Sequence, residues 1–176
     1  EAIAGEMLIS GASIQLFDTM PILKNGAARA AFTGRQFHLD TMEGRIEGDS
    51  GEAITIRNGT YRLPDYEADP PIQNIGFRVA GSLSTMTGLM RREPLSRSSA
   101  GLSAMPNQVK GLADLSIRVI APLMPNPPEG QLDYAVEGML TNVDATLSNG
   151  QRLSEAKLSV KAGPDNLDVV GSGQLM

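Results

Sequence analysis

Alternation of apolar and polar residues with a period of two is the feature that most constrains the fold of this chain. Successive side chains of a strand point to opposite faces, so the alternation predicts strands with one buried and one solvated face. We expect about a dozen short strands, at the spacing typical of antiparallel all-β proteins. The apolar positions of the clearest strands are Ile54, Ile56, Ile75, Phe77, Val79, Leu115, Ile117, Val119, Leu132, Tyr134, Val136, Leu158 and Val160.

Turn-forming residues separate these strands. Asn-Gly pairs tolerate positive φ and favour tight turns, and Pro-Asp and Gly-Pro-Asp sequences favour turns as well. Strands joined by short turns form antiparallel meanders, not parallel βαβ units. The expected turns are Asn25-Gly26, Asn58-Gly59, Pro64-Asp65, Asn149-Gly150, Gly163-Pro164-Asp165 and the stretch 122–130.

One segment departs from the strand pattern. Between Ser82 and Arg92 the apolar residues Leu83, Met86, Leu89 and Met90 have helical spacing, and Ser82 is a suitable N-cap. The following residues up to 111 have no clear period and predict a loop. We therefore expect β segments at about 12–81 and 112–175, joined by a helix and loop at 82–111. The chain, 1–176, is expected to be a single section of a longer protein.

Composition argues against several functional classes. The net charge of −5 is unlike the basic surface of most nucleic-acid binders, and the absence of Cys excludes thiolate metal sites and Cys nucleophiles. His38 is the single histidine. The sequence around Ser50, Gly48 to Glu52, resembles a serine-protease motif, but only 49 residues precede Ser50, so a polar hairpin turn is the preferred interpretation. We predict no catalytic residue, no metal site and no cofactor.

Two further patterns concern the surface and the interior. Two groups of acidic residues, Asp40 with Glu43 and Asp65 with Glu67 and Asp69, lack a calcium-loop pattern and are interpreted as turn residues. The chain has only 4% aromatic residues, which predicts a smooth aliphatic apolar face. The basic residues expected on the opposite, outer face are Arg57, Arg78, Arg118, Lys157 and Lys161.

Two stretches, from Ala12 to Leu95 and from Val109 to Leu175, carry a family resemblance. The first has Pro21-Ile22-Leu23 followed by Gly26, and a GxLxxLxxLLxxxPL-like element from Gly81 to Leu95. The second has a GxAxxxxxxxxPL…Y.V.G.L.dv-like element from Gly111 to Val143. In this order and spacing, the stretches resemble the repeating central periplasmic region of the AsmA-like proteins of Gram-negative bacteria, in particular the YhdP type, which are bridge-like lipid transfer proteins.

The resemblance implies a mainly β fold, a strongly curved antiparallel meander sheet like a split tube or taco, with one short helix. It also implies a periplasmic hydrophobic groove that conducts phospholipids between the inner and outer membranes and contributes to outer-membrane integrity in the cell envelope. The implied full-length protein is anchored to the inner membrane by an N-terminal helix absent from this fragment. Its partners are phospholipid acyl chains and components of the two membranes, with no nucleic acid.

Three alternatives stay open from the sequence. The strand pattern also fits a β-sandwich, in which the thirteen apolar positions named above form a packed core and not a groove lining. A second function is an assembly or chaperone scaffold for outer-membrane proteins that acts by sheet-edge pairing, as proposed for TamB relatives. A third is a scaffold with a dry core. An enzyme is the least favoured class.

Overall fold

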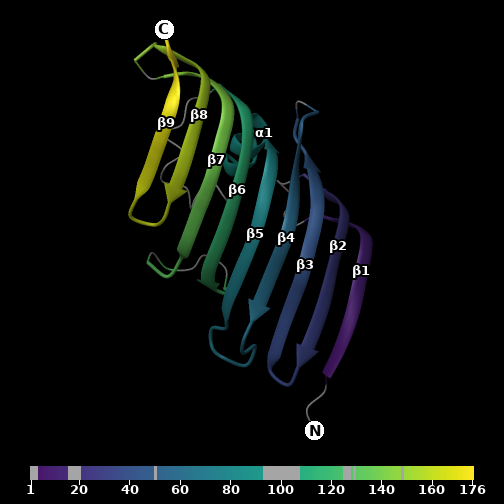
Figure 1. The fold of residues 1–176 in the computed structure, drawn as a ribbon. Coiled ribbons are helices and arrows are strands. Elements are labelled where there is room, and N and C mark those ends of the chain that lie inside the picture. The colour runs from purple at the N-terminus through teal and green to yellow at the C-terminus, as the bar shows by residue number, and fades with distance from the viewer. Residues whose placement is uncertain are drawn as a thin grey trace.

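The computed structural model describes residues 4–15, 21–49, 51–92, 108–124, 128, 130–147 and 149–176. These residues form one open antiparallel sheet in which the strands follow the order of the chain (Figure 1). The expected mainly β meander is confirmed, and the described residues form one sheet instead of the two of a sandwich. The strands are β1 (Ala4–Ile14), β2 (Leu23–Thr33), β3 (Gln36–Glu47), β4 (Ala53–Leu63), β5 (Ile72–Ser82), β6 (Val109–Pro122), β7 (Asp133–Thr146), β8 (Arg152–Ala162) and β9 (Leu167–Leu175).

The two expected β segments belong to the same sheet. β5 pairs with β6 over the whole length of β5, from Ile72 opposite Pro122 to Ser82 opposite Leu112. β1 and β9 are the two edges of the sheet that the described residues form (Figure 1). β1 and β6 begin earlier than residues 12 and 112, where the segments were expected, and the loop expected after the helix lies mostly outside the described residues.

Two of the expected turns are wrong. Asn25-Gly26 lies within β2, and Asn58-Gly59 lies within β4. Asn25 and Asn58 have φ of 54° and 50°, and the pairing of their strands shifts register there. An Asn that tolerates positive φ suits a β-bulge as well as a turn. The strands therefore continue through these positions, and the described residues form nine long strands where about a dozen short ones were expected.

Three of the other expected turns are where they were predicted, whereas part of the expected stretch 122–130 lies outside the described residues. Pro64 and Asp65 follow β4, Gly163 to Asp165 separate β8 from β9, and Gly150 donates its N–H to Leu147 O at 2.9 Å in the turn between β7 and β8. These turns join neighbouring strands, which gives the meander its simple order.

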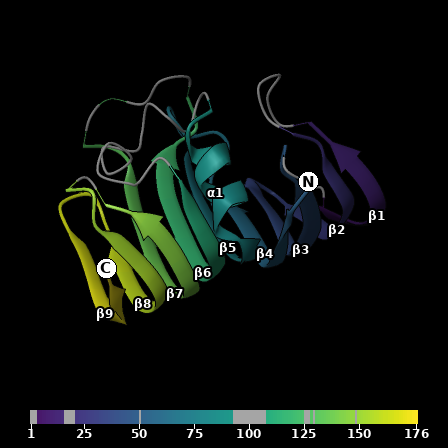
Figure 2. The ribbon, with the colours of Figure 1, turned by 90° about the horizontal axis from the view of Figure 1, so that it is seen from above.

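The expected helix is α1 (Leu83–Met90). Ser82 caps its N-terminus by accepting a hydrogen bond from the Thr85 N–H at 3.2 Å, as predicted. Leu83, Met86 and Leu89 are buried, and Figure 2 shows α1 lying over one face of the sheet. No helix in the described part of the chain is long and apolar enough to cross a bilayer.

Candidate functional site

The face of the sheet beneath α1 carries five rows of apolar, aromatic or glycine residues that run across the strands. Residues that face one another in the register of neighbouring strands point to the same side, so each row can be followed from strand to strand. We call this side the apolar face and number its rows from the end that carries α1. Each row below is given in strand order.

Row 1 is Leu23, Ile46, Ile54, Gly81, Ala113, Leu140, Leu158 and Gly171. Row 2 is Gly44, Ile56, Val79, Leu115, Gly138, Val160 and Val169. Row 3 is Phe77, Ile117, Val136, Ala162 and Leu167. Row 4 is Met7, Ala30, Leu39, Tyr61, Ile75, Val119 and Tyr134, and row 5 is Gly5, Phe32, Phe37 and Leu63.

The opposite face of the sheet is mainly polar and charged. One of its rows is Arg57, Arg78, Ser116, Glu137, Lys161 and Asp168. Arg118 and Lys157 lie in other rows of this face, so all five basic residues expected on the outer face are there. Arg78 Nε and Asp114 Oδ1 are 2.6 Å apart. The Arg78 guanidinium hydrogen-bonds Asp114 and lowers the pKa of that carboxyl.

The helix covers one end of the apolar face. Leu83, Met86 and Leu89 of α1 form a buried cluster with sheet residues of rows 1 and 2, among them Ile54 and Val79. Val143 and Ala156, which lie beyond row 1 at the same end of the sheet, complete this cluster together with Ala113. This end of the apolar face is therefore a packed core.

Rows 4 and 5 lie outside this cluster and form what we call the open strip. None of their residues belongs to the described core cluster or to the partly buried residues packed against it. Met7 is 57% exposed and Phe32 43% exposed, most of the others are half-buried, and Ala30 and Leu63 are buried. Burial raises the pKa of the Tyr61 phenol above its ordinary value.

The open strip is where the aromatic side chains gather. Phe32, Phe37, Tyr61 and Tyr134 belong to rows 4 and 5, and Phe77 belongs to row 3. The Phe37 and Tyr61 rings pack edge to face with centroids 6.0 Å apart. The expectation of a smooth aliphatic face is therefore wrong at this end. Five of the six aromatic residues that the structure describes lie on this face.

The described residues that were weighed for chemistry lie on the polar face of the sheet or in turns. His38 lies on the polar face, where its Nε2 is 3.6 Å from Asp40 Oδ2. Asp40 also accepts a hydrogen bond from Arg62 at 2.6 Å. Gly48, Asp49, Gly51 and Glu52 belong to the turn between β3 and β4, and Ser50 lies outside the described residues. Among the described residues, no group of three metal-ligating side chains is found.

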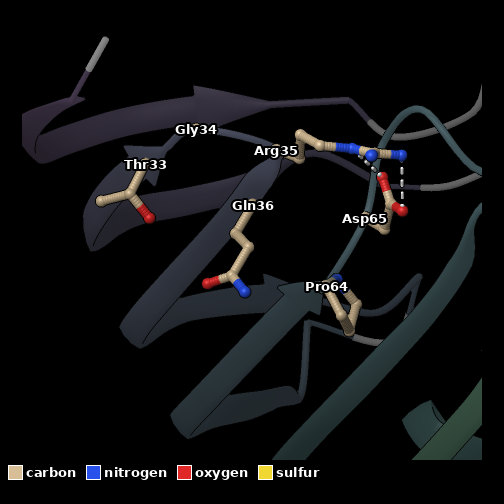
Figure 3. A pocket seen from close by; sticks show the side chains of 6 residues that line it. All are labelled: Thr33, Gly34, Arg35, Gln36, Pro64 and Asp65. Atoms are coloured by element: carbon tan, nitrogen blue, oxygen red, sulfur yellow. Dashed lines mark hydrogen bonds and ion pairs between the residues drawn. The ribbon is translucent and has the colours of Figure 1, made fainter. Parts of the chain in front are cut away.

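A shallow open hollow of about 670 Å³ lies between the β2–β3 hairpin and the turn after β4. It is lined by Thr33, Gly34, Arg35, Gln36, Pro64 and Asp65 (Figure 3). Arg35 Nη2 and Asp65 Oδ2 are 2.8 Å apart, and Arg35 Nε is 3.0 Å from Glu67 Oε2. The guanidinium in this hollow is thus already engaged by carboxylates, and these contacts join the two turns.

Twelve of the thirteen apolar residues predicted to line a groove lie in rows 1 to 4 of the apolar face. Leu132 is the exception, since it lies just before β7. The structure divides the set: Ile54 and Val79 are in the core cluster under α1, whereas Ile75, Val119 and Tyr134 are in the open strip. Whether these residues contact lipid stays a prediction.

Sequence reasoning left out the part of the open strip that comes from β1 to β4. The omitted residues include Ala30, Phe37, Leu39 and Tyr61. The alternation around Phe37 and Leu39 and around Tyr61 and Leu63 is visible in the sequence. This apolar–polar alternation is out of phase with the alternation in the rest of β3 and β4, because Thr41 and Asn58 adopt positive φ at register shifts.

Comparison of the chain with protein-family models, with curated proteins and with solved structures finds no match.

Proposed function

We propose that this chain is a section of a lipid conduit whose apolar face carries phospholipid acyl chains between the inner and outer membranes of a Gram-negative cell envelope. The observation that carries the proposal is the set of five rows, which run across the strands without a charged residue. A chain molecule lying along a row meets only apolar or aromatic side chains and glycine. The opposite, charged face keeps the section in water.

The energetics of such binding need no specific polar contact. Each CH₂ group that leaves water contributes about 0.8 kcal/mol. Strands are about 4.8 Å apart, so row 4, which crosses from β1 to β7, is roughly 29 Å long. A row of this length accommodates an extended acyl chain, and the chain can shift along it because neighbouring positions are chemically alike.

The resemblance to the AsmA-like, YhdP-type region supports the same function and its place in the cell. In this proposal the chain is periplasmic and belongs to a protein anchored in the inner membrane, and it contributes to outer-membrane integrity. Its partners are phospholipids and membrane components reached through the full-length protein. It acts by binding, without a cofactor and without catalysis.

Native mass spectrometry of the purified protein tests the proposal together with a matched pair of variants. Val119 lies in row 4 and Ser116 lies on the polar face of the same strand. Val119→Lys places a charge where an acyl chain would lie, so we expect at least about a tenfold loss of co-purified phospholipid. Ser116→Lys adds the same charge on the other face and should leave bound lipid unchanged.

Circular dichroism on both variants separates lost binding from lost folding. A folded wild-type protein that never carries phospholipid, even after incubation with phospholipid vesicles, contradicts the proposal. Equal lipid occupancy of Val119→Lys and Ser116→Lys would mean that the apolar face is not the binding surface.

The β9 edge favours a second candidate function, the assembly of outer-membrane proteins by strand pairing. Every residue of β9 is exposed, and Val170 is 71% exposed. β9 has neither the Lys nor the Pro residues that often protect sheet edges, and Asp168 is its single charged residue. In the described sheet β9 pairs with β8 on one side only, and an edge strand of this composition is suited to hydrogen-bond an extended segment of another protein.

The two candidates respond oppositely to the same substitutions. Binding of an unfolded outer-membrane β-barrel precursor by edge pairing should survive Val119→Lys and be lost when Val170 is replaced by Lys. Lipid binding should be lost in Val119→Lys and should survive Val170→Lys. Fluorescence anisotropy of a labelled precursor and native mass spectrometry of lipid, measured on both variants, distinguish them.

A further inference from the structure

We propose that α1 is a fixed wall that confines acyl chains to the open strip of rows 4 and 5. This inference rests on the proposed function and adds to it the location of the acyl-chain site. The alternative is a gate, in which α1 lifts off the sheet and lets acyl chains use rows 1 and 2 as well. The contacts of α1 favour the wall.

The apolar side of α1 is held by packing. Leu83, Met86 and Leu89 are 4%, 7% and 9% exposed, and they contact Ile54, Val79 and other residues of the core cluster. Truncation of one such side chain to Ala typically costs about 2–5 kcal/mol. Lifting the helix would expose all three together with the sheet residues beneath them, so the open form is strongly disfavoured.

Polar contacts hold the N-terminal end of α1. Glu52 accepts hydrogen bonds from the hydroxyls of Ser82 at 2.6 Å and Ser84 at 2.5 Å. The Thr85 hydroxyl donates to the Glu52 backbone carbonyl at 3.3 Å. These contacts tie the first turn of α1 to the residue that precedes β4.

An ion pair holds the other end of the helix. Arg92, just beyond α1, lies with Nη2 at 2.6 Å from Asp49 Oδ2 in the turn between β3 and β4. Both ends of α1 are therefore joined to the same turn, while its apolar side is joined to the sheet. A helix attached at both ends and along one side has the contacts of a wall.

The open strip beside this wall has the dimensions and charge of an acyl-chain site. Side chains two apart on a strand are about 7 Å apart, so two rows make a strip roughly 14 Å wide and, along row 4, about 29 Å long. Row 5 crosses only β1 to β4 and is therefore about 14 Å long, so the strip covers about 300 Å². This is less than half of the roughly 800 Å² per partner that a stable protein interface buries. Rows 4 and 5 contain no Asp, Glu, Lys, Arg or His. A narrow uncharged strip fits one or two acyl chains better than a second protein.

Photolabelling tests the assignment directly. A phosphatidylethanolamine with a diazirine in its acyl chain is bound to the full 176-residue chain, irradiated, and the labelled residues are identified by peptide mass spectrometry. The wall predicts labels at strip residues such as Leu39, Ile75 and Val119. It predicts none at Ile54, Val79 or Ala113 under α1.

An engineered disulfide separates a wall from a gate. The chain has no Cys, so Gly48→Cys with Thr85→Cys introduces one pair. A Cβ at position 48 would lie 3.2 Å from the Thr85 Cβ, close to the 3.5–4.5 Å typical of disulfides. The bond would lock α1 to the β3–β4 turn. The wall predicts the same labels and the same yield, within about twofold, in the oxidised and reduced forms of this variant.

The possible outcomes are distinct. Labels at Ile54 or Ala113 in the wild type, or a yield that falls about tenfold on oxidation and returns on reduction, would overturn the wall and indicate a gate. If the disulfide does not form or disturbs folding, the wild-type label pattern still decides between them. An absence of labels from both ends of the apolar face would overturn the proposed function and the wall together, whereas labels in the strip alone support both.

Discussion

The two ends of the apolar face are built from the same kind of rows and differ in what covers them. Under α1, rows 1 and 2 contain the aliphatic residues Ile54 and Val79, which are 5% and 4% exposed. In the open strip, Phe37, Leu39 and Tyr61 are half-buried and no described residue of α1 packs on them. One sheet face thus provides a core at one end and an accessible surface at the other.

This difference shows how an open sheet can be stable without closing on itself. Apolar rows that are all exposed would bury too little surface to offset the entropy of folding. Rows that are all covered would leave no surface for a ligand. Packing of α1 on rows 1 and 2 stabilises the sheet at one end, so the apolar rows at the other end need not be covered.

The largest expected effect is on stability, and it separates the two ends. Leu83→Ala removes a buried side chain from the core cluster and should lower the free energy of unfolding by about 2–5 kcal/mol. Leu39→Ala removes the same atoms from the half-buried open strip and should cost roughly 1 kcal/mol. Urea unfolding followed by circular dichroism measures both. Equal losses would mean that α1 does not define the core.

A smaller effect is expected from two glycines near α1. Gly81 has a φ of +139°, and a Cβ there would collide with the backbone of Ala53 and Ile54, so Gly81→Ala should cost about 1–3 kcal/mol. Gly88 lies on the exposed side of α1 with open space around it, and Gly88→Ala should stabilise the protein by about 1 kcal/mol. Thermal unfolding of the two variants should therefore shift in opposite directions. A stabilised Gly81→Ala would contradict the close approach of β4 and β5 in row 1.

The parts of the fold that sequence predicts are those set by local patterns. The spacing of Leu83, Met86 and Leu89 after Ser82 predicts α1 and its cap, and these features are confirmed. Period-two alternation predicts the strands and the antiparallel meander, because each strand signals its two faces within a few residues. The turns at Pro64-Asp65 and Asn149-Gly150 are set by the same kind of short-range signal.

The parts that sequence does not predict depend on contacts between distant residues. The sequence Asn58-Gly59 predicts a turn. It forms a bulge within β4 only because the residues on both sides of it pair with β3 and β5. That bulge changes the phase of the alternation and so hides Tyr61 as a member of the apolar face. The division of this face into core and open strip depends on where α1 packs, which no local pattern specifies.

The smallest predicted effect is on the pH dependence of stability in acid, and it should be similar for ion pairs behind the covered end and behind the open strip. Asp114 lies behind the covered end and pairs with Arg78, while Asp40 lies behind the open strip and pairs with Arg62. Hydrogen bonds from these arginines lower the pKa of both carboxyls in the folded protein. A group whose pKa is lower in the folded state stabilises the fold above its unfolded pKa, and this contribution is lost as pH falls through the folded pKa.

Stability should therefore fall below about pH 4, the ordinary range for Asp. Both pairs are solvent-exposed, so each is worth at most about 1 kcal/mol at neutral pH. Urea unfolding between pH 2.5 and 7 should show a shallower acid dependence for both Asp114→Asn and Asp40→Asn than for the wild type. If only Asp114→Asn made the acid dependence of stability shallower, ion pairs of the polar face would stabilise the protein only behind the core. The two ends of the sheet would then differ on both faces.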